Sequence, residues 1–268
     1  MLNVNRSSYY KHYSSKPAKR TIENQEIASK ILLIYARHKK RLGAYKTRYI
    51  LERDYGIKIS LGRVYRLMKK LNLPKMSTDK PRVKKTHEEE GNCEDGLKRE
   101  FNQKAPNLVW VSDITYLKAG GRWYYLCIIM DLFSRKIIAW ELSDNLTSDL
   151  ATHVFKKAYE KRKPESGLMF HSDRGTQYTS KPFRQLLDSL HVVQSFSNKG
   201  NPFDNACCEC FFKYLKKEET NRRSYSSFEE LRLSIFEYIE GYYNSIRPHG
   251  TLNMMTPNEK EASYFKND

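Results

Sequence analysis

Three acidic residues, far apart in the chain, are the first candidates for chemistry. Asp113 ends a β-like run, LVWVSDITYL, and Asp173 ends a second apolar run, LMFHSD. Glu209 lies 36 residues after Asp173, inside a segment with helical periodicity. Their carboxylates are the hard oxygen ligands that Mg²⁺ prefers, and two such ions can hold the attacking and the leaving oxygen of an in-line displacement. The three residues therefore predict a two-metal site for phosphoryl transfer.

The segment around Glu209 has the pattern of an amphipathic helix, with Asn205 or Asp204 as its N-cap. Its apolar face would consist of residues spaced i, i+3, i+4 and i+7, namely Cys208, Phe211, Phe212 and Leu215. Glu209 borders this face, so its carboxylate could point inward beside a sheet. Lys216 follows Glu209 by seven residues, or two turns on the same side. A cation there could hold a DNA phosphate near the metals.

Each of these residues also has an ordinary interpretation. A single Asp at the end of a strand is usually a polar terminus, and a single Glu on an amphipathic helix usually faces solvent. Asp131 also follows an apolar run and is the strongest competitor for a ligand role, but we interpret it as a turn residue. We interpret His171 as structural or close to DNA rather than as a metal ligand. The neighbouring sequence has to decide between these alternatives.

Positive charge is concentrated in the first quarter of the chain. The net charge is +17, and residues 1–75 carry 19 Lys and Arg against 4 Asp and Glu. A strongly basic segment ahead of a nearly neutral one indicates a nucleic-acid-binding domain that precedes a catalytic domain. No apolar run reaches the roughly 18 residues of a membrane span. The five cysteines form no disulfide framework, which predicts a reducing cytosol.

Three short helices are predicted within residues 1–75. Their ranges are 22–38, 45–55 and 61–71. Gly56 would be the C′ residue of the second helix and Ser60 the N-cap of the third. The third helix carries Arg63, Arg66 and Lys70 opposite its apolar stripe, which is the pattern of a helix-turn-helix that reads the major groove. The alternative is a helical bundle with a solvated basic face, and the charge favours DNA binding.

Residues 76–104 contain proline, glycine and mixed charge without periodicity, and they predict a linker. Residues 105–268 predict an α/β core in which three successive strands precede alternating helices and strands. The predicted strands are 108–117, 123–132, 136–142, 168–172 and 192–196, and the predicted helices are 147–162, 181–190 and 227–243. The pattern alone supports a mixed sheet with helices and no more specific fold.

Five sequence words occur in a fixed order along the chain. They are W-V-S-D-I-T-Y (110–116), H-S-D-R-G-T-Q-Y (171–178), G-N-P-F-D-N-A-x-x-E (200–209), L-K-K-E (215–218) and Y-Y-N-x-x-R-P-H-x-x-L (242–252). Together they resemble the transposases of the insertion-sequence-three family, whose core resembles retroviral integrases. The family usually has Ser or a similar small residue after its Glu. Cys210 stands at that position, and because Cys is small we expect the metal site to be kept.

The resemblance implies a ribonuclease-H-like (retroviral integrase-like) core and a DDE transposase whose triad is Asp113, Asp173 and Glu209. In that fold the first and fourth strands are neighbours, which would bring the two aspartates together. The triad would hold two Mg²⁺ ions, for which Mn²⁺ could substitute. One metal would activate a water that cleaves the element's end, and the freed 3′-OH would attack a second phosphodiester. Lys216 matches the family's basic residue seven positions after the Glu.

The expected partners are DNA, as terminal inverted repeats and target, and further copies of the chain, because two ends must be paired. Lys199, in the loop before the catalytic helix, is a candidate DNA contact. Arg247, in the last word, could contact DNA or pack against the core, and both alternatives stay open. The expected location is the bacterial cytoplasm, on the nucleoid when bound to DNA.

The family also places a first reading frame upstream, so the chain is expected to be a second-frame product. Two rival functions follow from the same residues. One is a metal-dependent nuclease of the same fold that only hydrolyses DNA. The other is a non-catalytic DNA-binding regulator, or a partial transposase that needs fusion to the upstream frame.

Overall fold

The computed structural model describes residues 5–14, 17–73, 96–97, 100–197 and 205–266. It divides into two compact units, Met1–Met76 and Ser77–Asp268. Within the described residues, no helix is both long and apolar enough to cross a membrane.

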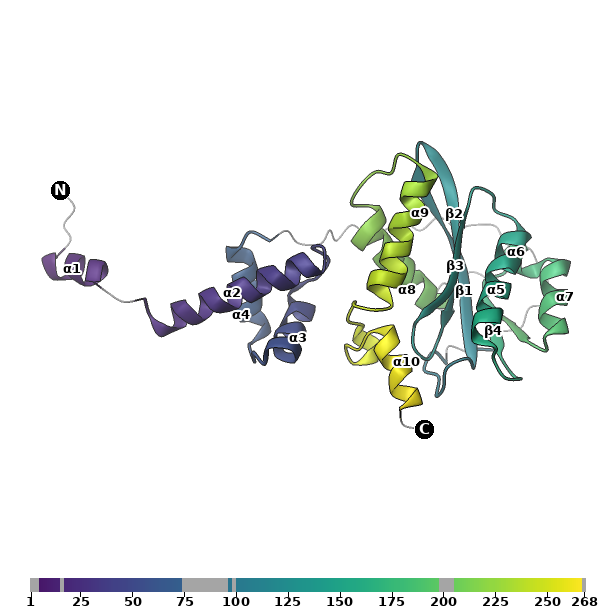
Figure 1. Cartoon of the computed structure of the whole chain (residues 1–268), viewed down its shortest axis with the longest axis horizontal. Helices are drawn as coiled ribbons and strands as arrows, with labels where there is room; N and C mark the ends of the chain where they lie inside the picture. The colour runs from purple at the N-terminus through teal and green to yellow at the C-terminus, as the bar shows by residue number, and fades with distance from the viewer. Residues whose placement is uncertain (1–4, 15–16, 74–95, 98–99, 198–204, 267–268) are drawn as a thin grey trace. The chain divides into compact units, whose positions relative to one another are not determined.

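The first unit is all-α in its described residues (Figure 1). Its helices are α1 (Arg6–Ser14), α2 (Lys19–Arg37), α3 (Ala44–Tyr55) and α4 (Leu61–Lys70). The last three match the predicted helices, whereas α1 falls in a segment for which the sequence predicted no helix. Helices α2, α3 and α4 pack around a common core that includes Ile31, Leu51 and Val64, all fully buried.

Local signals set the turn between α3 and α4. Gly56 ends α3 in the left-handed region at φ 66°, where glycine has no Cβ to clash. The Ser60 hydroxyl oxygen accepts a hydrogen bond from the backbone N–H of Arg63 at 3.3 Å and so caps α4. Both predicted caps are confirmed, and the helix–turn–helix geometry follows from them.

The second unit is built on a five-stranded mixed sheet. Its strands are β1 (Val109–Ala119), β2 (Arg122–Asp131), β3 (Ile137–Ser143), β4 (Met169–Ser172) and β5 (Val193–Phe196). Their order across the sheet is β3-β2-β1-β4-β5, with β1 antiparallel to β2 and parallel to β4. The expectation that the first and fourth strands are neighbours is therefore confirmed.

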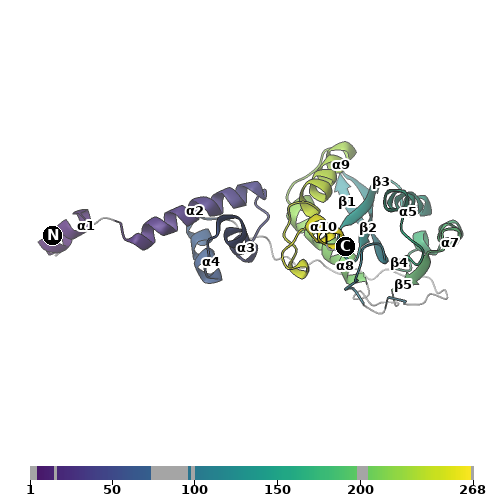
Figure 2. The same cartoon turned by 60° about the horizontal axis from the view of Figure 1, so that its bottom comes forward.

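Helices cover both faces of this sheet (Figures 1 and 2). One face carries α5 (Ser148–Arg162), α6 (Thr176–Thr179) and α7 (Lys181–Ser189), and the other carries α8 (Ala206–Leu215) and α9 (Phe228–Phe236). The alternation of side chains along a strand supplies both cores, because successive residues point to opposite faces. In β1, Val109 and Val111 join the α8 face, whereas Trp110 joins the α5 face.

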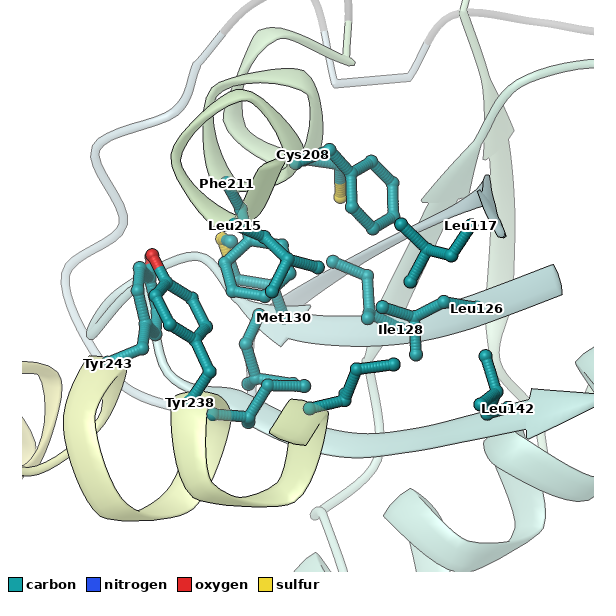
Figure 3. Packing of buried hydrophobic residues seen from close by; sticks show 14 of the residues in the cluster. Leu117, Leu126, Ile128, Met130, Leu142, Cys208, Phe211, Leu215, Tyr238 and Tyr243 are labelled. Carbon is teal, nitrogen blue, oxygen red and sulfur yellow. The ribbon is translucent and has the colours of Figure 1, made fainter. Parts of the chain in front are cut away.

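The α8 face holds the larger core (Figure 3). Strand residues such as Leu126, Ile128 and Met130 lie below Phe211 and Leu215 of α8. The predicted apolar face of α8 is confirmed, since Cys208, Phe211, Phe212 and Leu215 are all buried. This packing fixes α8 against the sheet and makes it a rigid platform for the residues on its other side.

Both helices on this face change character along their length. Helix α8 continues as a π-helical segment, η2 (Lys216–Thr220), and α9 continues as a second, η3 (Glu237–Tyr243). The sequence predicted a single last helix over 227–243. It did not predict either π segment, the 3-10 turn η4 (Gly250–Leu252), or the final helix α10 (Pro257–Phe265), which begins with a capping box at Thr256.

The range 76–104, which the sequence predicts as a linker, includes residues that pack against the second unit. Leu97 is buried in the core of the second unit, and the N–H groups of Gly96 and Leu97 donate to the Ser195 hydroxyl oxygen at 2.9 and 3.2 Å. Further along, Arg135 donates to the backbone carbonyl of Phe101 at 2.9 Å. The segment that leads into β1 is therefore part of the core from Gly96 onward in the described residues.

Candidate active site

Asp113 lies inside β1, not at its end as the sequence suggested. The strand runs on to Ala119 because it stays paired with β2, where Asp113 faces Ile128. Its pairing with β4 is shorter and ends at Val111 opposite His171. Two residues further in this parallel register, Asp113 is level with Asp173, which follows β4 directly. The register therefore makes neighbours of two aspartates that are 60 residues apart in the sequence.

Backbone groups orient both aspartates. One carboxylate oxygen of Asp113 accepts from the N–H of Ile114 at 2.8 Å, and one of Asp173 accepts from the N–H of Gly175 at 3.1 Å. A Cβ at Gly175 would lie 2.8 Å from the Gln177 side chain and 3.1 Å from this Asp173 oxygen. The glycine of the H-S-D-R-G word thus lets the chain turn closely around the carboxylate.

Glu209 lies on α8 with its side chain exposed, and α8 covers the face of the sheet that carries Asp113. Asp113 shares its side of β1 with Val109 and Val111, which is the side that α8 covers. Asn205 stands at the N-cap position, as one of two predicted candidates, but its side chain makes no cap hydrogen bond. Instead its amide nitrogen donates to the carbonyl of Ser112 at 3.0 Å. This bond ties the start of α8 to the strand one residue before Asp113.

Electrostatic interactions link the predicted site residues to one another. Burial raises the pKa of the Asp113 carboxyl well above its ordinary value, and the negative charge of Asp173 raises it further. Glu209 acts in the same direction, while the Lys216 ammonium lowers this pKa. Partial burial also raises the pKa of Glu209, and burial lowers the pKa of Lys216. The four residues therefore form one electrostatic cluster on the α8 face.

The donor set suits a hard divalent cation in its chemistry, because carboxylate oxygens are its preferred ligands. A cation would also relieve the repulsion between Asp113 and Asp173. However, no three His, Cys, Asp or Glu side chains among the described residues are close enough to ligate one ion together. The two aspartates are in place, and Glu209 would have to approach them to complete the ligand set.

The two competing residues have the structural roles that the sequence suggested. Asp131 is fully buried, and its carboxylate accepts from the backbone N–H groups of Asn107 and Ser134 at 2.7 and 3.0 Å, which confirms it as a turn residue. His171 is fully buried, and its ring nitrogens hydrogen-bond the hydroxyls of Ser195 and Ser197. Neither side chain belongs to the cluster around Asp113.

Arg247, one of the candidate DNA contacts, has its side chain in the core. Its side chain is 2% exposed and forms an ion pair with Glu218, which is equally buried. The guanidinium also lies over the ring of Tyr214, 4.0 Å from its centroid. Of the two alternatives left open, packing against the core is the observed one. The neighbouring Asn244 is likewise buried and bonds both backbone groups of Ile137 in β3.

The other predicted DNA contacts differ in their surroundings. Arg66 and Lys70 are exposed on α4. Arg63 is half-buried, and its guanidinium bonds Glu23 at 2.9 Å and Asn24 at 2.8 and 3.0 Å, so it links α4 to α2. Lys199 lies outside the described residues.

Sequence reasoning missed the two residues near Lys216 that contact Arg247, namely Glu218 and Tyr214. The only available signal was the last letter of the L-K-K-E word, which ends on Glu218. Its partner, Arg247, is 29 residues away in the chain, and no local pattern pairs them.

Family comparisons agree with this architecture. The family model described as integrase core domain matches residues 103–202, a second model of the same description matches residues 190–257, and a model described as HTH-like domain matches residues 22–82. With the mixed sheet and its carboxylates, these matches define the class: a polynucleotidyl transferase with an integrase core and an N-terminal helix-turn-helix-like domain.

Curated relatives identify the family within this class. The chain is 34% identical over 250 residues to the transposase for insertion sequence element IS904 of Lactococcus lactis subsp. lactis (strain IL1403), covering 92% of this chain and 97% of the relative. It is 34% identical over 259 residues to the putative transposase InsK for insertion sequence element IS150 of Escherichia coli (strain K12), covering 96% and 89%. The chain belongs to the insertion-sequence-three family of transposases.

A solved structure similar to this chain is the HTLV-2 integrase catalytic core domain in complex with magnesium. It is 17% identical with a TM-score of 0.42, and the similarity covers 59% of this chain and 98% of that one. The predicted fold class and the prediction of a DDE transposase, an enzyme, are confirmed by the family membership. Binding to DNA and dependence on a divalent cation are consistent with it.

Proposed function

We propose that Asp113, Asp173 and Glu209 together hold the divalent cations with which this transposase cuts the ends of its element and joins them to target DNA. The observation that carries this assignment is the electrostatic cluster on the α8 face, where burial and two neighbouring carboxylates act on Asp113. Asp113 and Asp173 are half-buried beside each other, and two like charges so placed are costly for folding unless a counter-charge is bound. A divalent cation, with a DNA phosphate behind it, supplies that charge.

Each residue has a distinct task in this proposal. Asp113 and Asp173 are held by backbone N–H groups, so their carboxylates are already oriented. Glu209 projects from a rigid helix and closes on the aspartates when cations and DNA bind. Lys216, two helical turns along, holds a non-bridging oxygen of the scissile phosphate. When bound, two Mg²⁺ ions, or Mn²⁺ in their place, would activate water and stabilise the leaving oxygen.

The substrates in this proposal are the terminal inverted repeats of the element and a target duplex. The first unit, with its exposed basic helix α4, binds DNA. Two ends have to be paired before joining, so the active form is an assembly of at least two copies of the chain.

The experiment is a cleavage and strand-transfer assay on DNA that carries the element's ends, with Mg²⁺ or Mn²⁺. Glu209→Gln should bind the DNA but neither cleave nor join it, because an amide is a poorer ligand for a hard cation. Chelation of the metal should have the same effect on the wild type. The matched control is Glu160→Gln, which alters an exposed glutamate on α5, on the opposite face of the sheet, and should leave both reactions unchanged.

Three other outcomes would contradict the proposal. Wild type that hydrolyses the ends but never joins them would be a nuclease. Wild type that only binds DNA would be a regulator or a partial transposase. Full activity of Glu209→Gln would remove this residue from the site.

Helix α4 provides a separate prediction for DNA binding. Arg66→Ala and Lys70→Ala should each weaken binding to any DNA sequence and reduce the slope of log K against log salt by about 1, because each removes one phosphate contact. Arg63→Ala should instead lower the unfolding temperature of the first unit, since this side chain bonds α2. Filter binding at several salt concentrations and thermal unfolding distinguish the two effects. An unchanged salt slope for both Arg66→Ala and Lys70→Ala would exclude α4 as the DNA-binding face.

A further inference from the structure

A buried ion pair lies behind the proposed active site. Glu218 of η2 is 2% exposed, and so is Arg247, which follows η3. Glu218 accepts three hydrogen bonds: from Arg247 Nε and NH2 at 2.8 Å each, one to either oxygen, and from the Tyr238 hydroxyl at 2.9 Å. Charges this deeply buried are tolerated only where hydrogen bonds satisfy them. Glu218 of η2 is thus bound both by Arg247, after η3, and by Tyr238 of η3.

Arg247 also contacts α8 before the π segment begins. Its guanidinium lies 4.0 Å from the centroid of the Tyr214 ring, a distance at which a cation and an aromatic face attract each other. Tyr214 precedes Lys216 by two residues, and Glu218 follows it by two. Arg247 therefore holds the chain on both sides of Lys216, at the junction where α8 becomes η2.

The direction of Lys216 follows from this contact. Residues two apart on a helix point to nearly opposite sides, because one turn holds about 3.6 residues. Tyr214 and Glu218 face Arg247 in the core, so Lys216 faces the other way. The charge of Lys216 in turn acts on the carboxyl of Asp113.

The π segment η2 makes the direction of the Lys216 side chain dependent on Arg247. A π turn replaces i→i+4 with i→i+5 hydrogen bonds, is rare, and occurs mostly as a single turn within an α-helix, frequently at a functional site. Relaxing η2 into an ordinary α-helix would rotate Glu218 away from its present direction. The bidentate ion pair opposes this change. Only the planar guanidinium of arginine can donate to both carboxylate oxygens while it stacks on an aromatic ring.

We propose that Arg247 is a positioning residue of the transposase: by gripping Glu218 and stacking on Tyr214, it directs Lys216 toward the DNA phosphate at the carboxylate site. Arg247 itself touches no DNA. The inference rests on the proposed role of Lys216 and adds to it how the direction of this side chain is fixed. It also gives the R-P-H word, more than thirty residues after the catalytic helix begins, a part in the reaction.

The same unit contains a matched control. Glu261 of α10 is 9% exposed and forms an ion pair with Arg162 of α5, which is 13% exposed. A second partner, Lys136, lies 2.6 Å from Glu261. This ion pair is nearly as buried as that of Glu218, but it links α10 to α5 and involves no residue of α8 or η2. Arg162→Lys therefore makes the same chemical change as Arg247→Lys at a place that does not orient Lys216.

The test is a double-mutant cycle in the full chain. Arg247→Lys, Lys216→Ala and the double variant are compared in single-turnover cleavage of element-end DNA under Mg²⁺. Arg247→Lys alone should slow cleavage by about tenfold to a hundredfold, the effect of a small misplacement of a group at a reacting centre. In the Lys216→Ala background it should have no further effect, because the group it positions is gone. Arg162→Lys should leave the rate per folded molecule unchanged.

A second variant keeps the test informative if Arg247→Lys does not fold. Tyr214→Leu removes the stacking surface but leaves the ion pair intact, and it should show the same dependence on Lys216. Equal slowing by Arg247→Lys with and without Lys216 would make its role purely structural and overturn the inference. Full activity of Lys216→Ala would also overturn it, while leaving the separate Glu209→Gln test of the carboxylate site untouched.

Discussion

Asp113→Asn is expected to abolish DNA cleavage and, in the absence of metal, to raise the unfolding temperature of the second unit. Folding places this carboxyl in a half-buried site where loss of solvent, together with the charges of Asp173 and Glu209, raises its pKa well above the ordinary value. The asparagine side chain has nearly the same shape but carries no charge. The variant should therefore gain stability while losing the ligand.

The pH dependence of this effect has a definite sign. In the unfolded chain an aspartate titrates at a pKa of about 4. Because the folded pKa is higher, the carboxyl favours folding at pH values below the unfolded pKa, and this contribution is lost as the pH rises through the folded pKa. The stability advantage of Asp113→Asn should thus be small in acid and largest at neutral pH. For a unit of this size, each kcal/mol corresponds to about 2–4 °C in unfolding temperature.

Metal addition should reverse the order of the two proteins. Saturating Mg²⁺ should stabilise the wild type, by about 2.7 kcal/mol at a hundred times its dissociation constant, and should stabilise Asp113→Asn much less. Loss of this metal ligand should remove several kcal/mol of transition-state stabilisation. The cleavage rate should therefore fall by a factor of about a thousand or more. Thermal unfolding with chelator and with Mg²⁺ measures the stability of each protein, and the cleavage assay measures the rate. The control is Asp144→Asn, which changes an exposed aspartate. If Asp113→Asn without metal is less stable than the wild type, Asp113 is a structural residue.

Arg247→Leu is expected to reduce the free energy of unfolding of the second unit by about 3–5 kcal/mol, the cost of leaving one partner of a buried ion pair uncompensated. Glu218 would keep the Tyr238 hydroxyl as a donor but lose both bonds from the guanidinium. Acidification, which neutralises the isolated carboxylate, should restore part of the stability.

Urea unfolding of the wild type, Arg247→Leu and the double variant Glu218→Gln/Arg247→Leu measures this cost. Replacing both charges by neutral groups should recover most of the lost stability, because the large penalty belongs to the single uncompensated charge. If the double variant is no more stable than Arg247→Leu, the loss arises from the cavity and the lost stacking on Tyr214 and not from the charge.

Local patterns were sufficient for most of the regular elements. Helices α3 and α4 were bounded correctly because Gly56 and Ser60 act on their nearest neighbours. The strands were found because buried residues alternate or run together along them. The π segments could not be found in this way, since η2 depends on contacts between Glu218 and a residue from a distant part of the chain.

For the site, the sequence supplied candidate residues but not their geometry. The order and spacing of the sequence words pointed to Asp113, Asp173 and Glu209. The same words left open whether Arg247 contacts DNA or packs against the core, because its acidic partner lies 29 residues away in the chain. Whether an arginine is a surface cation or one half of a buried pair depends on tertiary contacts, which the spacing of residues along the chain does not specify.

The attachment of Gly96 and Leu97 to Ser195 bears on how the catalytic unit can be separated from the rest of the protein. A fragment that starts at residue 105 would lose the Leu97 side chain from its interior and both donors from the Ser195 hydroxyl. The uncovered apolar surface would favour self-association of such a fragment. A fragment that starts upstream of Gly96 would keep the Leu97 side chain in its interior. The part of this transposase that folds independently is therefore longer than its sheet and helices alone suggest.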